Sequence, residues 1–73
     1  MSAEEFSKWI VKRAGEYLSA VVVSRWGEVQ FVRWRKSAYD AWMTDDKETA
    51  EDIAGKFMGE IVRFNPITGD IRE

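Results

Sequence analysis

The chain has 73 residues, a formal net charge of −2 and neither histidine nor cysteine. This length predicts one domain, near the lower limit for a core that is stable without disulfides or a metal. The fold must therefore be stabilised by burial of apolar side chains, which make up 45% of the residues and include four Trp, four Phe and two Tyr. A domain this small cannot bury so many aromatic side chains completely, so we expect some of them on a contact surface.

Membrane insertion and export are not indicated. The longest apolar run, residues 20–23, is far shorter than the roughly 20 residues of a membrane span. Residues 1–5 include Glu4 and Glu5 and lack the basic start and apolar segment of a signal peptide. The sequence predicts a cytoplasmic protein with no membrane contact.

The first half of the chain has the composition of β-strands. Residues 9–11, 17–23 and 29–34 are rich in β-branched and aromatic side chains, which favour strands. Gly15 and Gly27 lie between these runs and mark short turns. We therefore expect an antiparallel meander of three strands.

The clearest local pattern is a capped amphipathic helix from about Asp46 to Met58. Asp46 suits the N-cap, and Glu48 lies in the first turn, where the helix dipole favours negative charge. We expect Gly59 to take the positive φ just past the helix end, and Gly55 to permit a close approach to the sheet. The apolar residues recur at helical spacing and predict one buried stripe: Ala50, Ile53, Ala54, Phe57 and Met58.

The segments that flank this helix complete the predicted fold. Residues 41–43 are expected to be a short extended piece, residues 60–64 a return strand and residues 65–70 a turn, after which Ile71 adds a last pairing residue. The sequence thus predicts an α+β fold. An antiparallel sheet, made of the three-strand meander and the return strand, is covered on one face by a single helix.

The start of the chain leaves two alternatives open. Residues 2–5 match a capping box, which favours an extra N-terminal helix over residues 3–13. Residues 9–11 are β-rich, and Gly15 lies where a hairpin would turn, which favours a strand from about Lys8. We expect the strand.

Short motifs follow one another in the order strand, strand, strand, helix, strand. They are Trp9–Lys12, Gly15–Leu18, Ala38 or Ala41 with Trp42 and Thr44, Glu48–Ala50, and Ile61–Phe64. Their order, over about residues 9–64, resembles small uncharacterised proteins encoded by phages and prophages. The resemblance implies no common chemistry. It implies a small accessory protein that binds and modulates a host macromolecule.

The composition argues against catalysis. Without histidine and cysteine, the commonest general base, the strongest nucleophile and the usual zinc ligands are missing. The glycines form no phosphate-binding loop, and the acidic residues around Asp46 lack the spacing of a Ca²⁺ loop. We therefore expect neither an enzyme nor a site for a cofactor, metal ion or small-molecule substrate.

The charges separate along the chain. Residues 1–37 carry seven Lys/Arg against four Glu (net +3), whereas residues 38–73 carry four against nine Asp/Glu (net −5). Trp and Arg are enriched in protein hot spots, and basic side chains beside indoles also suit phosphates and bases. The basic half offers the main candidate for partner binding: Arg25, Trp26, Arg33, Trp34, Arg35 and Lys36. The structural alternative is that Trp34 belongs to the core and the charges lie in water.

A second candidate is acidic. It comprises Asp45, Asp46, Glu48, Glu51 and Asp52. Such a patch can imitate phosphates in a basic groove, or it can be the solvated face of the helix. Taken together, the residues predict a non-catalytic module that binds a protein partner or forms a homodimer through an exposed strand. A nucleic-acid-binding module is the alternative.

Overall fold

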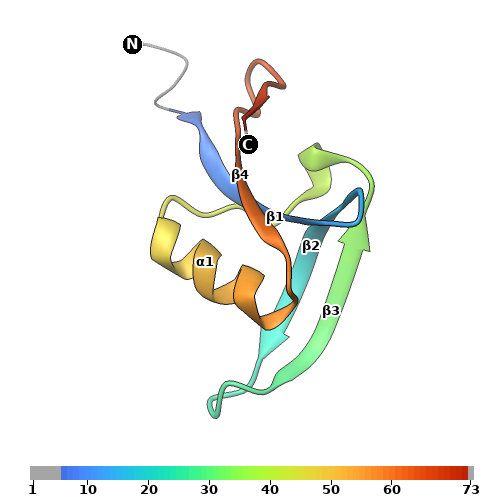
Figure 1. Cartoon of the computed structure of the whole chain (residues 1–73), viewed down its shortest axis with the longest axis vertical. Helices are drawn as coiled ribbons and strands as arrows, with labels where there is room; N and C mark the ends of the chain where they lie inside the picture. The colour runs from blue at the N-terminus through green and yellow to red at the C-terminus, as the bar shows by residue number, and fades with distance from the viewer. Residues whose placement is uncertain (1–5, 73) are drawn as a thin grey trace.

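The computed structural model describes residues 6–72 and confirms an α+β fold (Figure 1). Its strands are all antiparallel to their neighbours, in the order β3-β2-β1-β4-β5. The described residues form five strands, one more than predicted, because Ile71 pairs with Phe64 and begins a short final strand. The strands are β1 (Lys8–Arg13), β2 (Glu16–Val23), β3 (Val29–Arg35), β4 (Glu60–Phe64) and β5 (Ile71–Arg72).

The strand β1 decides between the two N-terminal alternatives. It pairs with β4 over five residues, from Lys8↔Phe64 to Lys12↔Glu60. A helix over residues 3–13 is therefore wrong for residues 8–13, because the long-range ladder with β4 satisfies their backbone in extended form. The capping box at residues 2–5 lies outside the described residues.

A two-residue turn at Ala14 and Gly15 joins β1 to β2. Their φ angles are 52° and 80°, and positive φ at both central residues is typical of a type I′ hairpin turn. The two strands pair next to this turn, at Lys12↔Tyr17 and Arg13↔Glu16, and then diverge.

An extended segment, residues 41–44, fills the gap between the diverging strands. Thr44 exchanges two backbone hydrogen bonds with Trp9 of β1, at 2.8 and 3.1 Å, and Trp42 donates its backbone N–H to Leu18 of β2 at 2.8 Å. The predicted extended piece is thus confirmed. Its insertion between two strands of the meander was not predicted, since it depends on partners far away in the sequence.

The predicted helix is confirmed as α1 (Lys47–Lys56), with Asp46 as its N-cap. Its C-terminus differs from the prediction, because Met58 and not Gly59 takes the positive φ, at 57°. Gly59 donates its N–H to the Ala54 carbonyl at 2.9 Å, which closes a Schellman-type end. Met58 is 92% exposed, so its place in the buried stripe is also wrong.

The two helix-end glycines have different roles from those predicted. A Cβ on Gly59 would lie 3.0 Å from the Lys12 carbonyl oxygen and 3.2 Å from Val11 Cγ1, so close approach to β1 explains this glycine. Gly55 is exposed, and a Cβ there would meet nothing within 4 Å. The predicted approach of Gly55 to the sheet is therefore wrong.

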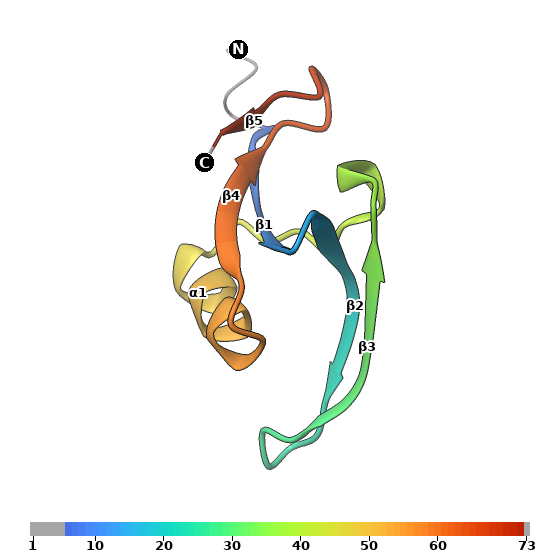
Figure 2. The ribbon, with the colours of Figure 1, turned by 45° about the vertical axis from the view of Figure 1, so that its right-hand side comes forward.

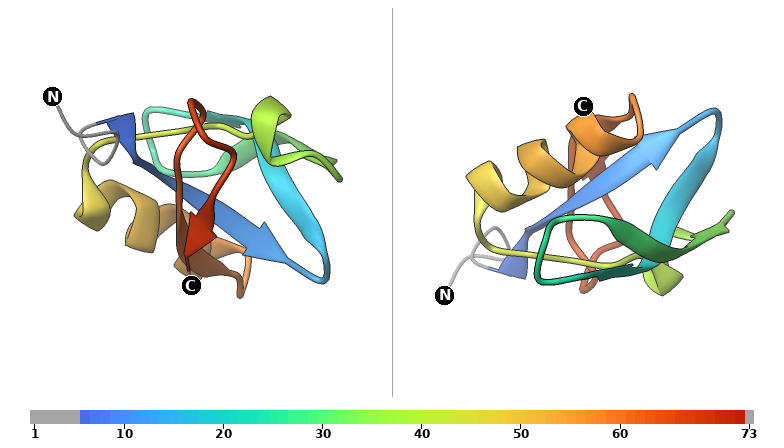
Figure 3. Two further views of the ribbon diagram at one scale, coloured as in Figure 1. Left: turned by 90° about the horizontal axis from the view of Figure 1, so that it is seen from above. Right: turned by 90° about the horizontal axis from the view of Figure 1, so that it is seen from below.

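The core lies on both sides of β1, whose successive residues point to opposite faces of the sheet. Val11 packs with Leu18 and with Ala54 of α1. Ile10 packs on the other side with Phe64 and other residues, and there the cover is the segment 41–44 with the short 3₁₀ helix η2 (Ala38–Asp40). Viewed from above, α1 and η2 lie on opposite sides of β1 (Figure 3).

The β2–β3 hairpin is less covered than the centre of the sheet. α1 packs against β1 and β4, whereas β2 and β3 run past its end as a curved two-stranded ribbon (Figure 2). This ribbon contributes to the elongated shape of the molecule, whose principal extents are 39 × 22 × 16 Å. Its inner face meets the helix side of the core, and its outer face carries several exposed apolar and basic side chains.

Candidate interaction surface

The predicted basic-aromatic segment is divided between two faces of β3. Val32 and Trp34 pack in the helix-side core, whereas Arg33 and Arg35 are exposed and alternate with them, so they point to the opposite face. The sequence pattern of residues 29–34 predicts this division, with Val29, Phe31 and Arg33 on one face. It holds from Phe31 to Trp34 but is wrong for Val29, because Gln30 is an extra residue in β3 and puts Val29 opposite Val23. Trp34 does not line the same surface as the arginines on either side of it.

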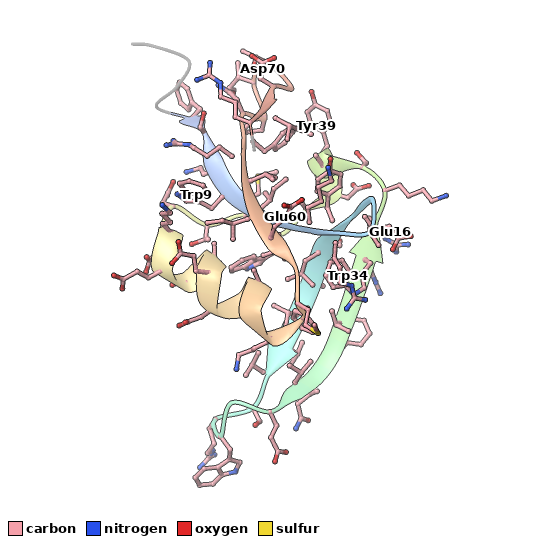
Figure 4. All side chains as sticks on the ribbon, in the orientation of Figure 1. Trp9, Glu16, Trp34, Tyr39, Glu60 and Asp70 are labelled. Atoms are coloured by element: carbon pink, nitrogen blue, oxygen red, sulfur yellow. The ribbon has the colours of Figure 1, made fainter. Side chains whose placement is uncertain are left out.

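Trp34 lies on β3 (Figure 4) and contacts Phe57, the C-cap of α1, and Arg13 of β1. Its ring meets Phe57 edge-on, with the ring centroids 5.7 Å apart. The guanidinium of Arg13 covers the Trp34 ring at 4.5 Å from its centroid. These contacts favour the structural alternative for Trp34 considered from the sequence.

The opposite face of the ribbon carries a continuous apolar and basic surface, which we call the outer face: Ala20, Val22, Phe31, Arg33 and Arg35. Val22 and Phe31 are direct cross-strand partners and are 53% and 46% exposed. The Arg33 guanidinium lies 5.5 Å from the centroid of the Phe31 ring. The apolar pair thus occupies the end of this surface nearest the hairpin turn, and positive charge occupies the middle, at Arg33, and the other end, at Arg35.

The hairpin turn at the far end of the ribbon presents a tryptophan. Trp26 is 80% exposed, and the Arg25 guanidinium lies 5.9 Å from its ring centroid. The turn is ordered by Ser24, whose hydroxyl oxygen accepts from the backbone N–H groups of Trp26 and Glu28 at 3.2 and 3.1 Å. Lys56 of α1 donates to the Gly27 carbonyl at 3.4 Å, which brings the helix end to the turn.

The structure therefore brings only part of the predicted set together. Arg33 and Arg35 share the outer face, Arg25 and Trp26 form the tip, and Lys36 is exposed just beyond the end of β3. Sequence reasoning missed Val22 and Phe31 as surface residues. Strict alternation from the buried Leu18 would place Val22 on the inner face. Ser19 is an extra residue in β2 that has no partner in β3, so the later residues switch faces and Val22 lies on the outer face.

Most side chains of the acidic candidate make contacts at the N-terminus of α1. Asp46 accepts from the backbone N–H of Glu48 at 3.0 Å and from the Thr49 hydroxyl at 2.8 Å. Asp45 pairs with Lys8 of β1 at 2.6 Å. Glu51 lies 3.9 Å from Lys47 one turn earlier, whereas Glu48 lies in the first turn and Asp52 is exposed. These contacts favour the helix-capping interpretation over a partner site.

One titratable group shows a clear effect of this capping. The hydrogen bond from the Thr49 hydroxyl is the main cause that lowers the pKa of Asp46, and the backbone N–H groups of Glu48 and Thr49 add to it. Each of these bonds favours the ionised carboxylate. The negative charge of Asp46 at neutral pH is therefore part of the helix cap.

Residues 6–72 offer neither a metal site nor a membrane-spanning helix. In this part of the chain, no group of three or more acidic side chains is placed so that it could hold a metal ion. The described residues include no helix long and apolar enough to cross a membrane. No protein-family model, curated protein or solved structure matches the chain.

Proposed function

We propose that this protein is a small, cytoplasmic, non-catalytic module that binds a protein partner through the outer face and tip of the β2–β3 ribbon. The observation that carries the proposal is the exposed apolar pair of Val22 and Phe31 on the outer face. The next pair, Val23 and Val29, is 37% and 41% exposed but points to the other face of the ribbon. Trp26 adds a further exposed apolar side chain at the tip. Apolar patches with a polar rim are typical of protein contact sites.

The basic rim gives the proposed surface its selectivity. Residues 17–36 contain four basic side chains, Arg25, Arg33, Arg35 and Lys36, against the single acidic residue Glu28. Arginine and tryptophan are the residues most often found as binding hot spots, and charge complementarity steers association. The partner surface is therefore expected to be acidic around an apolar centre. The resemblance to phage and prophage proteins supports a bacterial host factor as this partner.

Comparative affinity capture tests the proposal. Wild type, Phe31→Ser and Trp26→Ser are immobilised and exposed to a bacterial lysate, with Met58→Ser as the matched control. Met58 is 92% exposed and lies outside the ribbon, so the control makes a similar apolar-to-polar change elsewhere. We expect Phe31→Ser to reduce recovery of a specific partner about tenfold, in line with the loss of a hot spot. Equal recovery by Phe31→Ser and wild type would contradict the proposal.

Nucleic acid is the second candidate partner, and Trp26 favours it. An exposed indole beside Arg25 can stack on a base while the guanidinium meets a phosphate. This candidate predicts binding to an oligonucleotide that weakens steeply as salt rises. Titrations that stay flat at about 50 mM salt, where such contacts are strong, would remove it.

A further inference from the structure

The strand β3 is the long edge of the sheet. It is last in the order β3-β2-β1-β4-β5, and the opposite edge, β5, has two residues against seven in β3. An edge strand directs about half of its backbone N–H and C=O groups away from the sheet, where another chain can pair with them. The outer face adjoins this edge, so a partner on the outer face lies next to a pairing template.

Regular geometry is confined to part of this edge. Val22 pairs with Phe31 and Val23 pairs with Val29, which leaves Gln30 as an extra residue in β3. Such a bulge twists an edge strand and ends regular pairing. Each residue of β3 from Phe31 to Arg35 has a partner in β2, so this part of β3 contains no extra residue. The second irregularity, Ser19, lies on β2 opposite Trp34 and Arg33, and not among these five residues of the edge strand.

The side chains of these five residues specify what that strand must carry. On one face an added strand would lie beside Phe31, Arg33 and Arg35, two of which are cationic. On the other face it would lie beside Val32 and Trp34, which are half-buried and apolar. Because side chains of a strand alternate between faces, the complement has acidic residues at every second position and apolar residues between them. Opposite charges in cross-strand positions stabilise pairing, and like charges weaken it.

The same charges disfavour a second copy of this chain as the occupant. Antiparallel pairing of β3 with β3 centred on Arg33 would place the two Arg33 side chains opposite each other. Pairing centred on Trp34 would place each Arg33 opposite the Arg35 of the other copy. Basic residues on an edge strand are a known protection against self-pairing. In these two registers like charges oppose the pairing of two copies, whereas an acidic strand meets opposite charges at the same positions.

We propose that an extended peptide segment with alternating acidic and apolar residues adds to β3 as an antiparallel or parallel sixth strand over Phe31–Arg35. This proposal rests on the proposed function, because it names the chemistry and conformation of the partner on the same surface. Main-chain hydrogen bonds to the edge supply affinity, and the arginines select the sequence, as in other cases of strand addition. Because strand addition requires these main-chain hydrogen bonds, blocking them tests strand pairing separately from side-chain contact with the outer face.

The probe is a synthetic peptide as long as this segment, with Glu and Val alternating and both ends capped. It is titrated into the full ¹⁵N-labelled chain, and amide shifts are followed by NMR. We expect shifts concentrated at Phe31–Lys36, and none from the matching peptide with Lys in place of Glu. Two further peptides are N-methylated at alternate residues in opposite phases. In strand addition, only one set of alternate peptide N–H groups points toward β3. The peptide methylated at that set should bind about tenfold more weakly, and the peptide methylated at the other set should bind as before.

The protein variant Arg33→Glu/Arg35→Glu should abolish the shifts. Its matched control is Lys47→Glu/Arg63→Glu, which makes the same change in net charge at two side chains that flank Trp9. The amide spectrum of each variant shows directly that it folds. The control should bind the acidic peptide within about twofold of wild type, since long-range charge effects are screened at physiological salt.

Four outcomes overturn strand addition. If both N-methylated peptides bind alike and still shift Phe31 and Arg33, the outer face is a contact surface without strand pairing, and the proposed function survives. If the acidic peptide causes no shifts at all, there is no acidic strand site. If an oligothymidine shifts these residues and the acidic peptide does not, the surface is a nucleic-acid site and both proposals fail. If sedimentation shows a dimer that Arg33→Glu/Arg35→Glu dissociates, the occupant is a second copy.

Discussion

The guanidinium carbon of Arg13 lies 4.5 Å from the centroid of the Trp34 ring, and Arg13 Nη1 also donates to the Phe57 carbonyl at 3.2 Å. Phe57 in turn meets the Trp34 ring edge-on. The last residue of β1 thus joins β3 to the C-cap of α1. With Trp34 fixed on the inner face, Arg33 and Arg35 are fixed on the outer face, so the packing of this residue group determines the candidate surface.

Arg13→Ala should lower the free energy of unfolding by about 1 kcal/mol, because a cation–π contact and a hydrogen bond to a helix C-cap are lost together. Arg13→Lys should cost less, since it keeps a positive charge near the helix end but loses the planar stack on Trp34. Urea denaturation measures both. A double-mutant cycle with Trp34→Phe isolates the ring contact, and additive effects would show that Arg13 and Trp34 do not interact.

Met58→Gly should stabilise the protein by about 1 kcal/mol, because the strain of a non-glycine residue at positive φ is removed. Little packing is lost, as Met58 is 92% exposed. Gly59→Ala, one residue later, should destabilise, because the added Cβ meets the Lys12 carbonyl oxygen at 3.0 Å. Thermal unfolding of the two variants should therefore show stability changes of opposite sign, which tests the described geometry of the helix C-terminus. Destabilisation by Met58→Gly would contradict this description.

Gly55→Ala should raise the free energy of unfolding by about 0.5–1 kcal/mol, the usual gain for alanine over glycine in a helix interior. A Cβ at this position meets nothing within 4 Å, so no steric cost offsets the gain. Chemical denaturation measures the difference from wild type. A loss of stability would instead mean that Gly55 approaches another element, as its position in the sequence first indicated.

The stability of the protein should fall more steeply in acid for wild type than for Asp46→Asn. The pKa of Asp46 is lowered in the folded state, so its contribution is complete above the ordinary carboxyl range and is lost as pH falls below about 4. Asparagine caps helices about as well as aspartate but does not titrate there. The melting temperatures of the two proteins should be close at pH 7 and diverge toward about pH 2, where Asp46→Asn should be the more stable. Parallel curves would contradict this.

The local parts of the fold were predictable from the sequence. Asp46 and the Ala50–Ala54 spacing specify the start and buried side of α1 through contacts within a few residues. The turn at Ala14–Gly15 and the β-rich runs beside it specify the first hairpin. Even the division of Val32 and Trp34 from Arg33 and Arg35 follows from the period of a strand.

The features that were not predictable depend on distant partners. β1 is paired with β4, which is far away in the chain, and the segment 41–44 enters between β1 and β2 through hydrogen bonds to Trp9 and Leu18. The extra residue Ser19 shifts the register of β2 against β3, so the exposed position of Val22 could not be read from alternation. Tertiary pairing, and not local propensity, decided these features.

Site-specific photocrosslinking shows whether the outer face of the β2–β3 ribbon contacts a protein. A photoreactive phenylalanine analogue replaces Phe31 in one variant and the more exposed Met58 in the other, and both full-length variants are irradiated in bacterial cells. We predict a discrete covalent adduct with a protein from position 31 and none from position 58. No adduct from position 31, or the same adducts from both positions, would contradict the account.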